Sequence, residues 1–150
     1  VYVSLLDDVA AKLIRLSVGP ESRGGRTWQQ GEVAIPANSA LTLVAADEDD
    51  TLYANVQGFT EPSRLMRSVD GGAVRAVASA PAFFDAAKYE VRQRFATSKD
   101  GTRVPYFVVR PKGATGPLKT HYWAYGGFEV AMVPSYLSPE NQMWLEAGNQ

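Results

Sequence analysis

Tyr125-Gly126-Gly127-Phe128 follows a short apolar and aromatic run, Thr120-His121-Tyr122-Trp123-Ala124, and this junction decides the fold class. A short apolar run bounded by turn residues is typical of a strand buried on both faces. Because glycine tolerates positive φ and lets a ligand approach closely, the paired glycines predict a sharp loop at the end of that strand.

Loops that follow buried strands are where α/β enzymes bind ligands. We therefore interpret this loop as a candidate site, with the Tyr125 hydroxyl on one side and the Phe128 ring on the other. These two side chains would serve one polar and one apolar part of a substrate. The alternative is a strand end whose aromatic side chains only fill a core.

Composition limits the classes of protein that the chain can represent. Its 150 residues allow about one domain. The formal net charge is −1 and no run or face looks strongly basic, so no nucleic-acid partner is expected. The absence of cysteine excludes disulfides, thiolate catalysis and Cys-ligated zinc.

No apolar run approaches the roughly 18 residues that a membrane-spanning helix needs. Val1 opens directly on a strand-like run, without an initiator Met or a signal peptide. We therefore expect a soluble piece of a longer chain that does not contact a membrane. The expected compartment is the cytoplasm, with the periplasm as the alternative.

Residues 1–80 have the pattern of short strands separated by turn residues. Hairpins are predicted around residues 7–10 and around Asp70-Gly71-Gly72, with further strands at 41–45 and 52–57 and a polar loop over 21–30. The acidic run Asp47-Glu48-Asp49-Asp50 is interpreted as a solvated turn, because it lacks the glycine and distal glutamate of a calcium loop. Closely spaced strands of this kind are typical of a sandwich, barrel or propeller.

Residues 78–87 form a connector that carries Phe83-Phe84. Beyond it, alternating residues predict a hairpin of strands at 89–95 and 104–108 around a tight turn at 98–102. Tyr89, Val91, Gln93 and Phe95 should face one way, and Lys88, Glu90, Arg92 and Arg94 the other.

A helix is predicted to begin at Ser138-Pro139-Glu140, where a favoured N-cap precedes proline and an acid. Its spacing puts Met143, Trp144 and Ala147 on one face, and Gly148 is placed to end it. The chain thus changes from many short strands to the beginning of an α/β unit, near residues 78–87.

Four stretches resemble one family. Arg94-Phe95-Ala96-Thr97-Ser98-Lys99-Asp100-Gly101-Thr102-Arg103-Val104-Pro105 resembles the hairpin that opens the catalytic domain of prolyl oligopeptidases. Ala124-Tyr125-Gly126-Gly127-Phe128-Glu129-Val130, followed by Pro134-Ser135-Tyr136, resembles their tyrosine-bearing loop. Trp144-Leu145-Glu146-Ala147-Gly148 resembles the helix end that follows, and Phe59-Thr60-Glu61-Pro62-Ser63 resembles part of the last propeller blade. The resemblance covers residues 50–150 well and the earlier residues loosely.

The resemblance implies the C-terminal part of a seven-bladed β-propeller in residues 1–80. Residues 81–150 would then be the first strands and helix of an α/β-hydrolase domain. Such enzymes are serine peptidases that hydrolyse short peptides on the carboxyl side of proline. They use a Ser-Asp-His triad and need neither a cofactor nor a metal. The implied partners are a short proline-containing peptide and the remainder of the same peptidase chain.

In this family the residue that matches Tyr125 donates its hydroxyl to the oxyanion, and the residue that matches Phe128 helps line the proline pocket. The chain departs from the family in having no Gly-x-Ser-x-Gly elbow. The single histidine, His121, precedes the loop, whereas the triad order is Ser, acid, His, so His121 is interpreted as structural. The triad is expected outside this chain, and the 150 residues alone are expected to be inactive.

Two smaller departures are Gly148-Asn149 in place of two glycines and the bulky run His121-Tyr122-Trp123. The alternatives are the matching piece of a related oligopeptidase or acyl-peptide hydrolase, and a stand-alone β-rich binding module. The residues of two motifs, Asp100-Gly101-Thr102 and Tyr125-Gly126-Gly127-Phe128, favour the prolyl enzymes. An incomplete propeller would expose strand edges, so the isolated chain is expected to be marginally stable.

Overall fold

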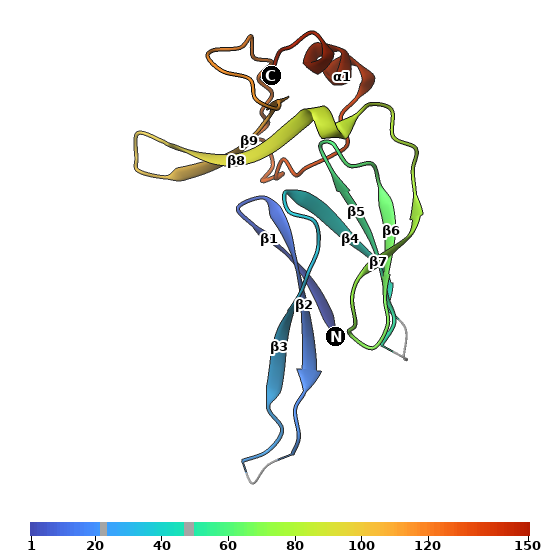
Figure 1. Cartoon of the computed structure of the whole chain (residues 1–150). Coiled ribbons are helices and arrows are strands. Elements are labelled where there is room, and N and C mark those ends of the chain that lie inside the picture. The colour runs from blue at the N-terminus through green and yellow to red at the C-terminus, as the bar shows by residue number, and fades with distance from the viewer. Residues whose placement is uncertain (22–23, 47–49) are drawn as a thin grey trace.

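The computed structural model describes residues 1–21, 24–46 and 50–150, and antiparallel sheets dominate it (Figure 1). The first sheet has the order β1-β2-β3 and the second the order β4-β5-β6-β7, followed by a two-stranded hairpin, β8-β9. The strands are β1 (Tyr2–Asp7), β2 (Ala10–Val18), β3 (Trp28–Val33), β4 (Ser39–Ala46), β5 (Leu52–Gly58), β6 (Arg64–Ser68), β7 (Arg75–Ser79), β8 (Tyr89–Thr97) and β9 (Arg103–Pro111). The helices are the short 3₁₀ helix η1 (Ala86–Lys88) and α1 (Pro139–Glu146).

The hairpins predicted from turn residues are confirmed. In the β1-β2 hairpin Asp7 faces Ala10, which leaves Asp8 and Val9 as a two-residue turn. The β6-β7 turn contains Gly71 at φ +70°, and the β8-β9 turn contains Gly101 at φ +87°. Both glycines adopt a left-handed conformation that other residues reach only with strain, so local sequence decides where these hairpins turn.

The predicted loop over residues 21–30 is wrong at its end, because β3 begins at Trp28, which pairs with Val18. Trp28 to Glu32 are exposed, so this edge strand shows none of the alternation that marks a half-buried strand. Hydrogen bonding to β2 defines the strand instead. Residues 22–23 of that loop, and residues 47–49 of the acidic run, lie outside the described residues.

The core lies between the first two sheets. Tyr2, Leu13 and Leu52 are its buried centre, and Val33, Ile35 and Leu41 pack against them. Along β5, buried and half-buried residues alternate strictly from Leu52 to Gly58, as expected for a strand with one face on the core.

An ion pair also joins the two sheets. The Arg15 guanidinium on β2 contacts the Asp50 carboxylate just before β5. It also lies against the β6-β7 turn, because a Cβ added to Gly71 would stand 2.5 Å from Arg15 Cζ. The absence of a side chain at Gly71 therefore makes room for this link.

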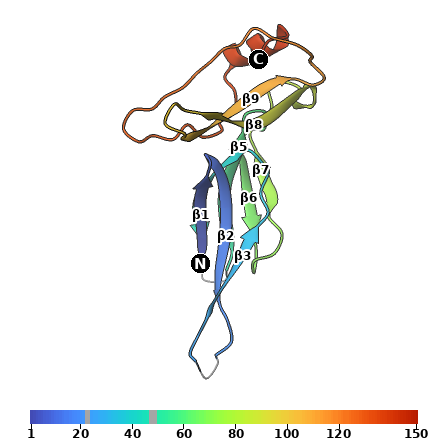
Figure 2. The ribbon, with the colours of Figure 1, turned by 90° about the vertical axis from the view of Figure 1, so that its left-hand side faces the viewer.

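Hairpin β8-β9 lies across one end of the sheets (Figures 1 and 2). Phe107 of β9 packs on Phe59 with ring centroids 5.2 Å apart, and the Gln93 side chain donates a hydrogen bond to the Asp8 carbonyl. Phe84 of the predicted connector stacks on Tyr136 at 5.5 Å, and the Phe83 amide donates to the Tyr136 hydroxyl at 2.9 Å. These contacts fasten the later part of the chain to the strands that precede it.

The described chain is thus mostly antiparallel sheet with one α-helix, α1. The division into a propeller part and a hydrolase part stays a prediction. No helix in the described residues has the length and apolarity needed to cross a membrane.

Candidate functional site

Residues 120–124, predicted as a buried strand, form no strand and are exposed. Tyr122 is 78% exposed and Trp123 is 73% exposed. A strand buried on both faces needs hydrogen-bonded neighbours and covering layers on each side. Among the described residues no strand pairs with this run, so the prediction is wrong and the run is a loop.

Hydrogen bonds to the last residue hold the beginning of this loop. The His121 amide donates to the Gln150 carbonyl at 2.8 Å, and the Gln150 amide donates to the Lys119 carbonyl at 3.0 Å. His121 Nδ1 lies 3.1 Å from Asn141 Oδ1, and its ring meets Trp144 edge-on at 6.3 Å. His121 thus fixes the loop to α1, in agreement with a structural role.

Helix α1 begins where the sequence predicts it. Ser138 has the extended backbone of an N-cap, although its side chain makes no capping hydrogen bond, and Pro139 is the first helical residue. The predicted apolar face is not the buried one, because Met143 and Ala147 are exposed while Gln142 and Leu145 are buried. The Gln142 side chain is satisfied in this position by donating to the Leu137 carbonyl at 2.8 Å.

The tyrosine-bearing loop has a tight local structure. The Val130 amide donates to the Gly127 carbonyl at 3.2 Å, which closes a turn with Phe128 and Glu129 at its centre. Their φ values are +55° and +56°, as in a type I′ turn. The positive φ angles therefore fall on Phe128 and Glu129 rather than on the two glycines, at a strain of about 1–2 kcal/mol for each residue.

Gly127 instead makes room for the Tyr125 side chain. A Cβ at Gly127 would lie 3.0 Å from the Tyr125 hydroxyl oxygen, so the tyrosine ring folds back over this glycine. Tyr125 is 50% exposed, and across residues 1–21, 24–46 and 50–150 nothing hydrogen-bonds to its hydroxyl. Phe128 is 93% exposed. The loop therefore presents an available hydrogen-bond donor and an uncovered ring.

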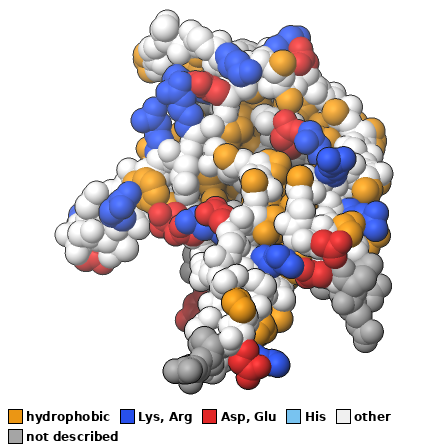
Figure 3. All heavy atoms as spheres, turned by 60° about the horizontal axis from the view of Figure 1, so that its bottom comes forward, with side chains coloured by type: hydrophobic (Ala, Val, Ile, Leu, Met, Phe, Trp, Pro, Cys, Tyr) orange, Lys and Arg blue, Asp and Glu red, His pale blue; other side chains and the backbone are white. Residues whose placement is uncertain are grey.

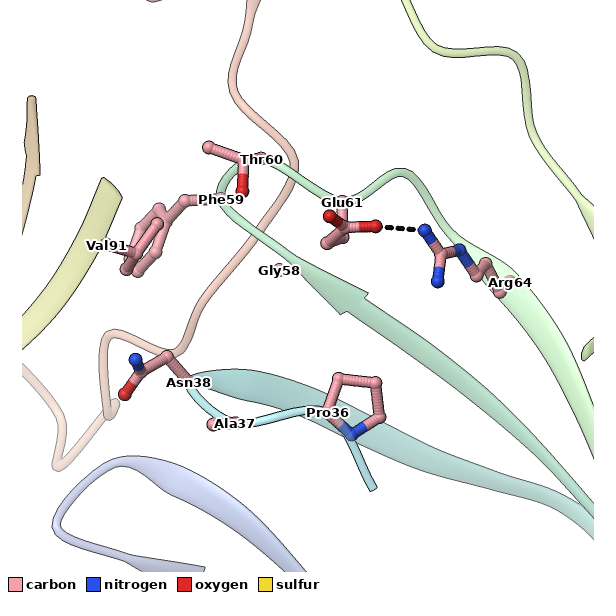
Figure 4. A pocket seen from close by; sticks show the side chains of 9 residues that line it. All are labelled: Pro36, Ala37, Asn38, Gly58, Phe59, Thr60, Glu61, Arg64 and Val91. Atoms are coloured by element: carbon pink, nitrogen blue, oxygen red, sulfur yellow. Dashed lines mark hydrogen bonds and ion pairs between the residues drawn. The ribbon is translucent and has the colours of Figure 1, made fainter. Parts of the chain in front are cut away.

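A separate hollow of about 510 Å³ lies between the second sheet and hairpin β8-β9 (Figure 4). Phe59 and Val91 stand together on one side of it, and the Glu61 carboxylate pairs with the Arg64 guanidinium on another. Its lining is Pro36, Ala37, Asn38, Gly58, Phe59, Thr60, Glu61, Arg64 and Val91. Neither Tyr125 nor Phe128 reaches it, and no sequence pattern predicts it because its walls come from three separate segments.

Within the described residues no three His, Asp or Glu side chains are grouped so as to hold a metal ion. Asp50, the one residue of the acidic run that is described, is paired with Arg15. At the Tyr125 loop the structure offers a hydrogen-bond donor and an exposed apolar ring.

Comparison with known proteins gives the family, although no family model matches. An uncharacterised peptidase of Sinorhizobium fredii is 40% identical over 150 residues, covering 97% of this chain and 20% of its own length. A prolyl endopeptidase of Elizabethkingia miricola is 30% identical over 121 residues, covering 78% of this chain and 17% of its own length. A solved structure from a study of two prolyl endopeptidases superposes over 98% of this chain and 21% of its own, with a TM-score of 0.76 and 27% identity. The chain belongs to the prolyl oligopeptidase family.

A post-proline cleaving enzyme from Rickettsia typhi shares the fold, with a TM-score of 0.75 at 24% identity over 99% of this chain and 21% of that one. The chain spans about a fifth of the length of the curated relatives it matches. The structure therefore describes about one fifth of the prolyl oligopeptidase fold, the part that matches these relatives.

The expectation that no run of this prolyl oligopeptidase chain is strongly basic is wrong for one segment. Residues 88–112, which contain hairpin β8-β9, carry seven Lys and Arg and two acidic side chains, hence a charge of +5 in a chain of −1 overall. The net charge of the whole sequence is close to zero because acidic residues elsewhere offset this basic segment.

Proposed function

We propose that this chain is part of a serine peptidase that hydrolyses short peptides on the carboxyl side of proline. In this proposal Tyr125 contributes to the oxyanion hole, and the Ser-Asp-His triad comes from the rest of the peptidase. The observation that carries it is the half-exposed Tyr125 hydroxyl, without a hydrogen-bond partner among the described residues, in a chain whose relatives include prolyl endopeptidases.

The chemistry needs such a donor at one moment. When a serine attacks the peptide carbonyl, the oxygen becomes negative, and a hydrogen bond from Tyr125 strengthens as that charge develops. The amine then leaves with a proton from the histidine, and water hydrolyses the acyl-enzyme. A donor that acts mainly on the developing charge raises kcat more than it lowers KM.

Phe128 has the complementary role. Its exposed ring is an apolar surface three residues from the donor. A proline ring is apolar and rigid, so stacking on Phe128 would hold the residue whose carbonyl is attacked. The positive φ of Phe128 and Glu129 supports this role, because backbone strain concentrates at functional loops.

The proposed architecture keeps the two parts predicted from the sequence, with 1–80 as propeller and 81–150 as the beginning of the hydrolase domain. The antiparallel order β4-β5-β6-β7 supports the first part, since a propeller blade is a four-stranded antiparallel sheet. β7 ends at Ser79, which agrees with a boundary near residue 80.

The test is Tyr125→Phe in the full-length peptidase. Loss of one oxyanion donor should lower kcat by about 10²–10³-fold, equivalent to ~3–4 kcal/mol, with an unchanged melting temperature. Tyr122→Phe is the matched control, because Tyr122 is exposed in the same loop and should leave kcat unaltered.

The measurements are kcat, KM and melting temperature with a proline-containing chromogenic peptide. The 150-residue chain alone should give no turnover of the same peptide. An unchanged kcat combined with a lower melting temperature would make Tyr125 a packing residue, and the oxyanion assignment would be withdrawn.

A further inference from the structure

The charges of hairpin β8-β9 are sorted onto one of its faces. Cross-strand register pairs Glu90 with Arg110, Arg92 with Val108 and Arg94 with Tyr106. Because successive strand residues point to opposite faces, these residues share one face of the hairpin. We name Glu90, Arg92, Arg94 and Arg110 the basic face.

The opposite face of the hairpin packs on the sheets. Phe107 contacts Phe59, Gln93 bonds to the Asp8 carbonyl, and Val91 lines the hollow. The basic face therefore points away from the sheets. The hairpin also projects from one side of the molecule, where basic, acidic and apolar side chains are visible (Figure 3).

The basic face keeps a positive charge after its internal ion pairs are counted. Arg110 Nε and Arg92 Nη2 each lie 2.7 Å from a Glu90 carboxylate oxygen. These hydrogen bonds, first from Arg110 and then from Arg92, lower the pKa of Glu90, so its carboxylate stays ionised. One carboxylate is thus shared by two guanidinium groups.

The third guanidinium on this face, that of Arg94, is exposed and has no ion pair with the described residues. Lys88 and Lys112 extend the charge at the open end of the hairpin, where the Lys112 amide donates to the Lys88 carbonyl at 2.8 Å. Lys88 and Lys112 are both exposed. Lys88 also lies 3.9 Å from an Asp85 carboxylate oxygen, so Arg94 and Lys112 are the cations of this row along the hairpin that have no ion pair among the described residues.

We propose that the basic face binds the acidic flank of an extended peptide substrate, an inference that rests on the proposed peptidase function. Side chains on one face of an extended strand repeat every second residue, at about 6.6–6.8 Å. Carboxylates at alternate positions of an extended peptide have the same repeat. They can therefore meet Arg92 and Arg94 in register, in the planar geometry that Arg and carboxylate share.

The segment between β9 and α1, which carries Tyr125, runs alongside the hairpin in both ribbon views (Figures 1 and 2).

A peptide fits this face better than a nucleic acid does. Glu90 lies in the middle of the row and would repel a continuous phosphate backbone, whereas a peptide can place a hydrogen-bond donor there. The relatives with named activities are peptidases as well.

The experiment uses the full-length peptidase and two fluorogenic peptides that differ only at alternate positions flanking the proline, with Glu in one and Gln in the other. At low salt the Glu peptide should have a kcat/KM about tenfold higher, since two exposed ion pairs each contribute modestly. At about 0.5 M salt the two values should converge, because salt screens exposed charges.

Variants locate the effect on the basic face. Arg92→Gln combined with Arg94→Gln should abolish the preference and leave the Gln peptide unchanged. Glu90→Gln should increase the preference. Arg103→Gln, compared with Arg94→Gln alone, is the matched control, because Arg103 pairs with Thr97 on the other face and each of these two variants removes one positive charge.

The inference is overturned if the double variant keeps the preference, or if Arg103→Gln lowers it as much as Arg94→Gln does. It is also overturned if a single-stranded oligonucleotide binds this face more tightly than the acidic peptide. Failure of the proposed function looks different, because then neither proline peptide is cleaved. In that case anisotropy of a labelled Glu-rich peptide without proline still tests the face, and loss of its binding in the double variant supports the inference.

Discussion

Strand β5 and the segment 120–130 are both rich in apolar side chains, yet one is buried and the other is exposed. In β5, Leu52, Ala54 and Val56 are 1%, 1% and 3% exposed, whereas Trp123 is 73% exposed and Phe128 is 93% exposed. β5 lies between β4 and β6, and its sheet packs on the first one. Residues 120–130 have no such neighbours in the described chain. Local apolarity therefore predicts what can be buried, but the cover comes from residues distant in sequence.

The largest expected difference between the two regions is in the cost of truncation. Leu52→Ala should lower the free energy of unfolding by about 2–5 kcal/mol, because it removes buried methyl groups and leaves a cavity. Trp123→Ala, although it removes a larger side chain, should change it by no more than about 0.5 kcal/mol. Urea denaturation of the full-length peptidase, followed by circular dichroism, measures both values. A comparable loss for Trp123→Ala would mean that the segment is packed in solution.

The turns show the same contrast between covered and uncovered sites. Gly71→Ala and Gly101→Ala both introduce a side chain at positive φ, at a cost of about 1–2 kcal/mol. At Gly71 the new methyl would also meet the Arg15 guanidinium, whereas at Gly101 no atom lies within 4 Å. Gly71→Ala should therefore cost about 0.2–1 kcal/mol more, the usual range for an exposed ion pair.

The double variant of Gly71→Ala with Arg15→Gln isolates that extra cost. Once Arg15 is replaced, Gly71→Ala should cost the same as Gly101→Ala. Equal costs in the wild-type background would show that the guanidinium moves aside freely and that its link to Asp50 is without effect on stability.

How far the sequence predicts this structure depends on whether the deciding contacts are local. The hairpins at Gly71 and Gly101 were predicted because a single residue sets the turn. Strand β3 was missed because its residues are exposed and only its pairing with β2 defines it. The buried strand at 120–124 was predicted from its apolar residues, and it fails because no described strand pairs with it.

For the candidate site, the sequence located the loop but not its geometry. Tyr125 and Phe128 were singled out by their neighbours in sequence, and their roles stay predictions. The turn at Phe128 and Glu129 was not foreseen, because glycine was the expected carrier of positive φ. The alternation of β8 predicts a face with Lys88, Glu90, Arg92 and Arg94, and the register adds what the sequence could not show, which is Arg110 beside Glu90 on that face.

The smallest expected difference concerns two left-handed turns, one in each region. Val9 in the β1-β2 turn has φ +62° and Glu129 has φ +56°. The Val9 turn is fixed by the pairing of Asp7 with Ala10 and by the bond from Gln93 to the Asp8 carbonyl. Val9→Gly should therefore raise the free energy of unfolding by about 0.5–1 kcal/mol, since relief of strain exceeds the entropy cost of glycine.

Glu129→Gly should give a smaller gain, below about 0.3 kcal/mol, although the two φ angles are similar. Its turn is closed by one hydrogen bond, from the Val130 amide to the Gly127 carbonyl, and the surrounding loop is exposed. Such a loop opens locally without unfolding the sheets, so strain within it is not fully expressed in the global free energy. Urea denaturation of the two variants and of the double variant measures both gains. Equal gains would mean that residues 120–130 unfold together with the sheets, and the contrast between the two regions would be lost.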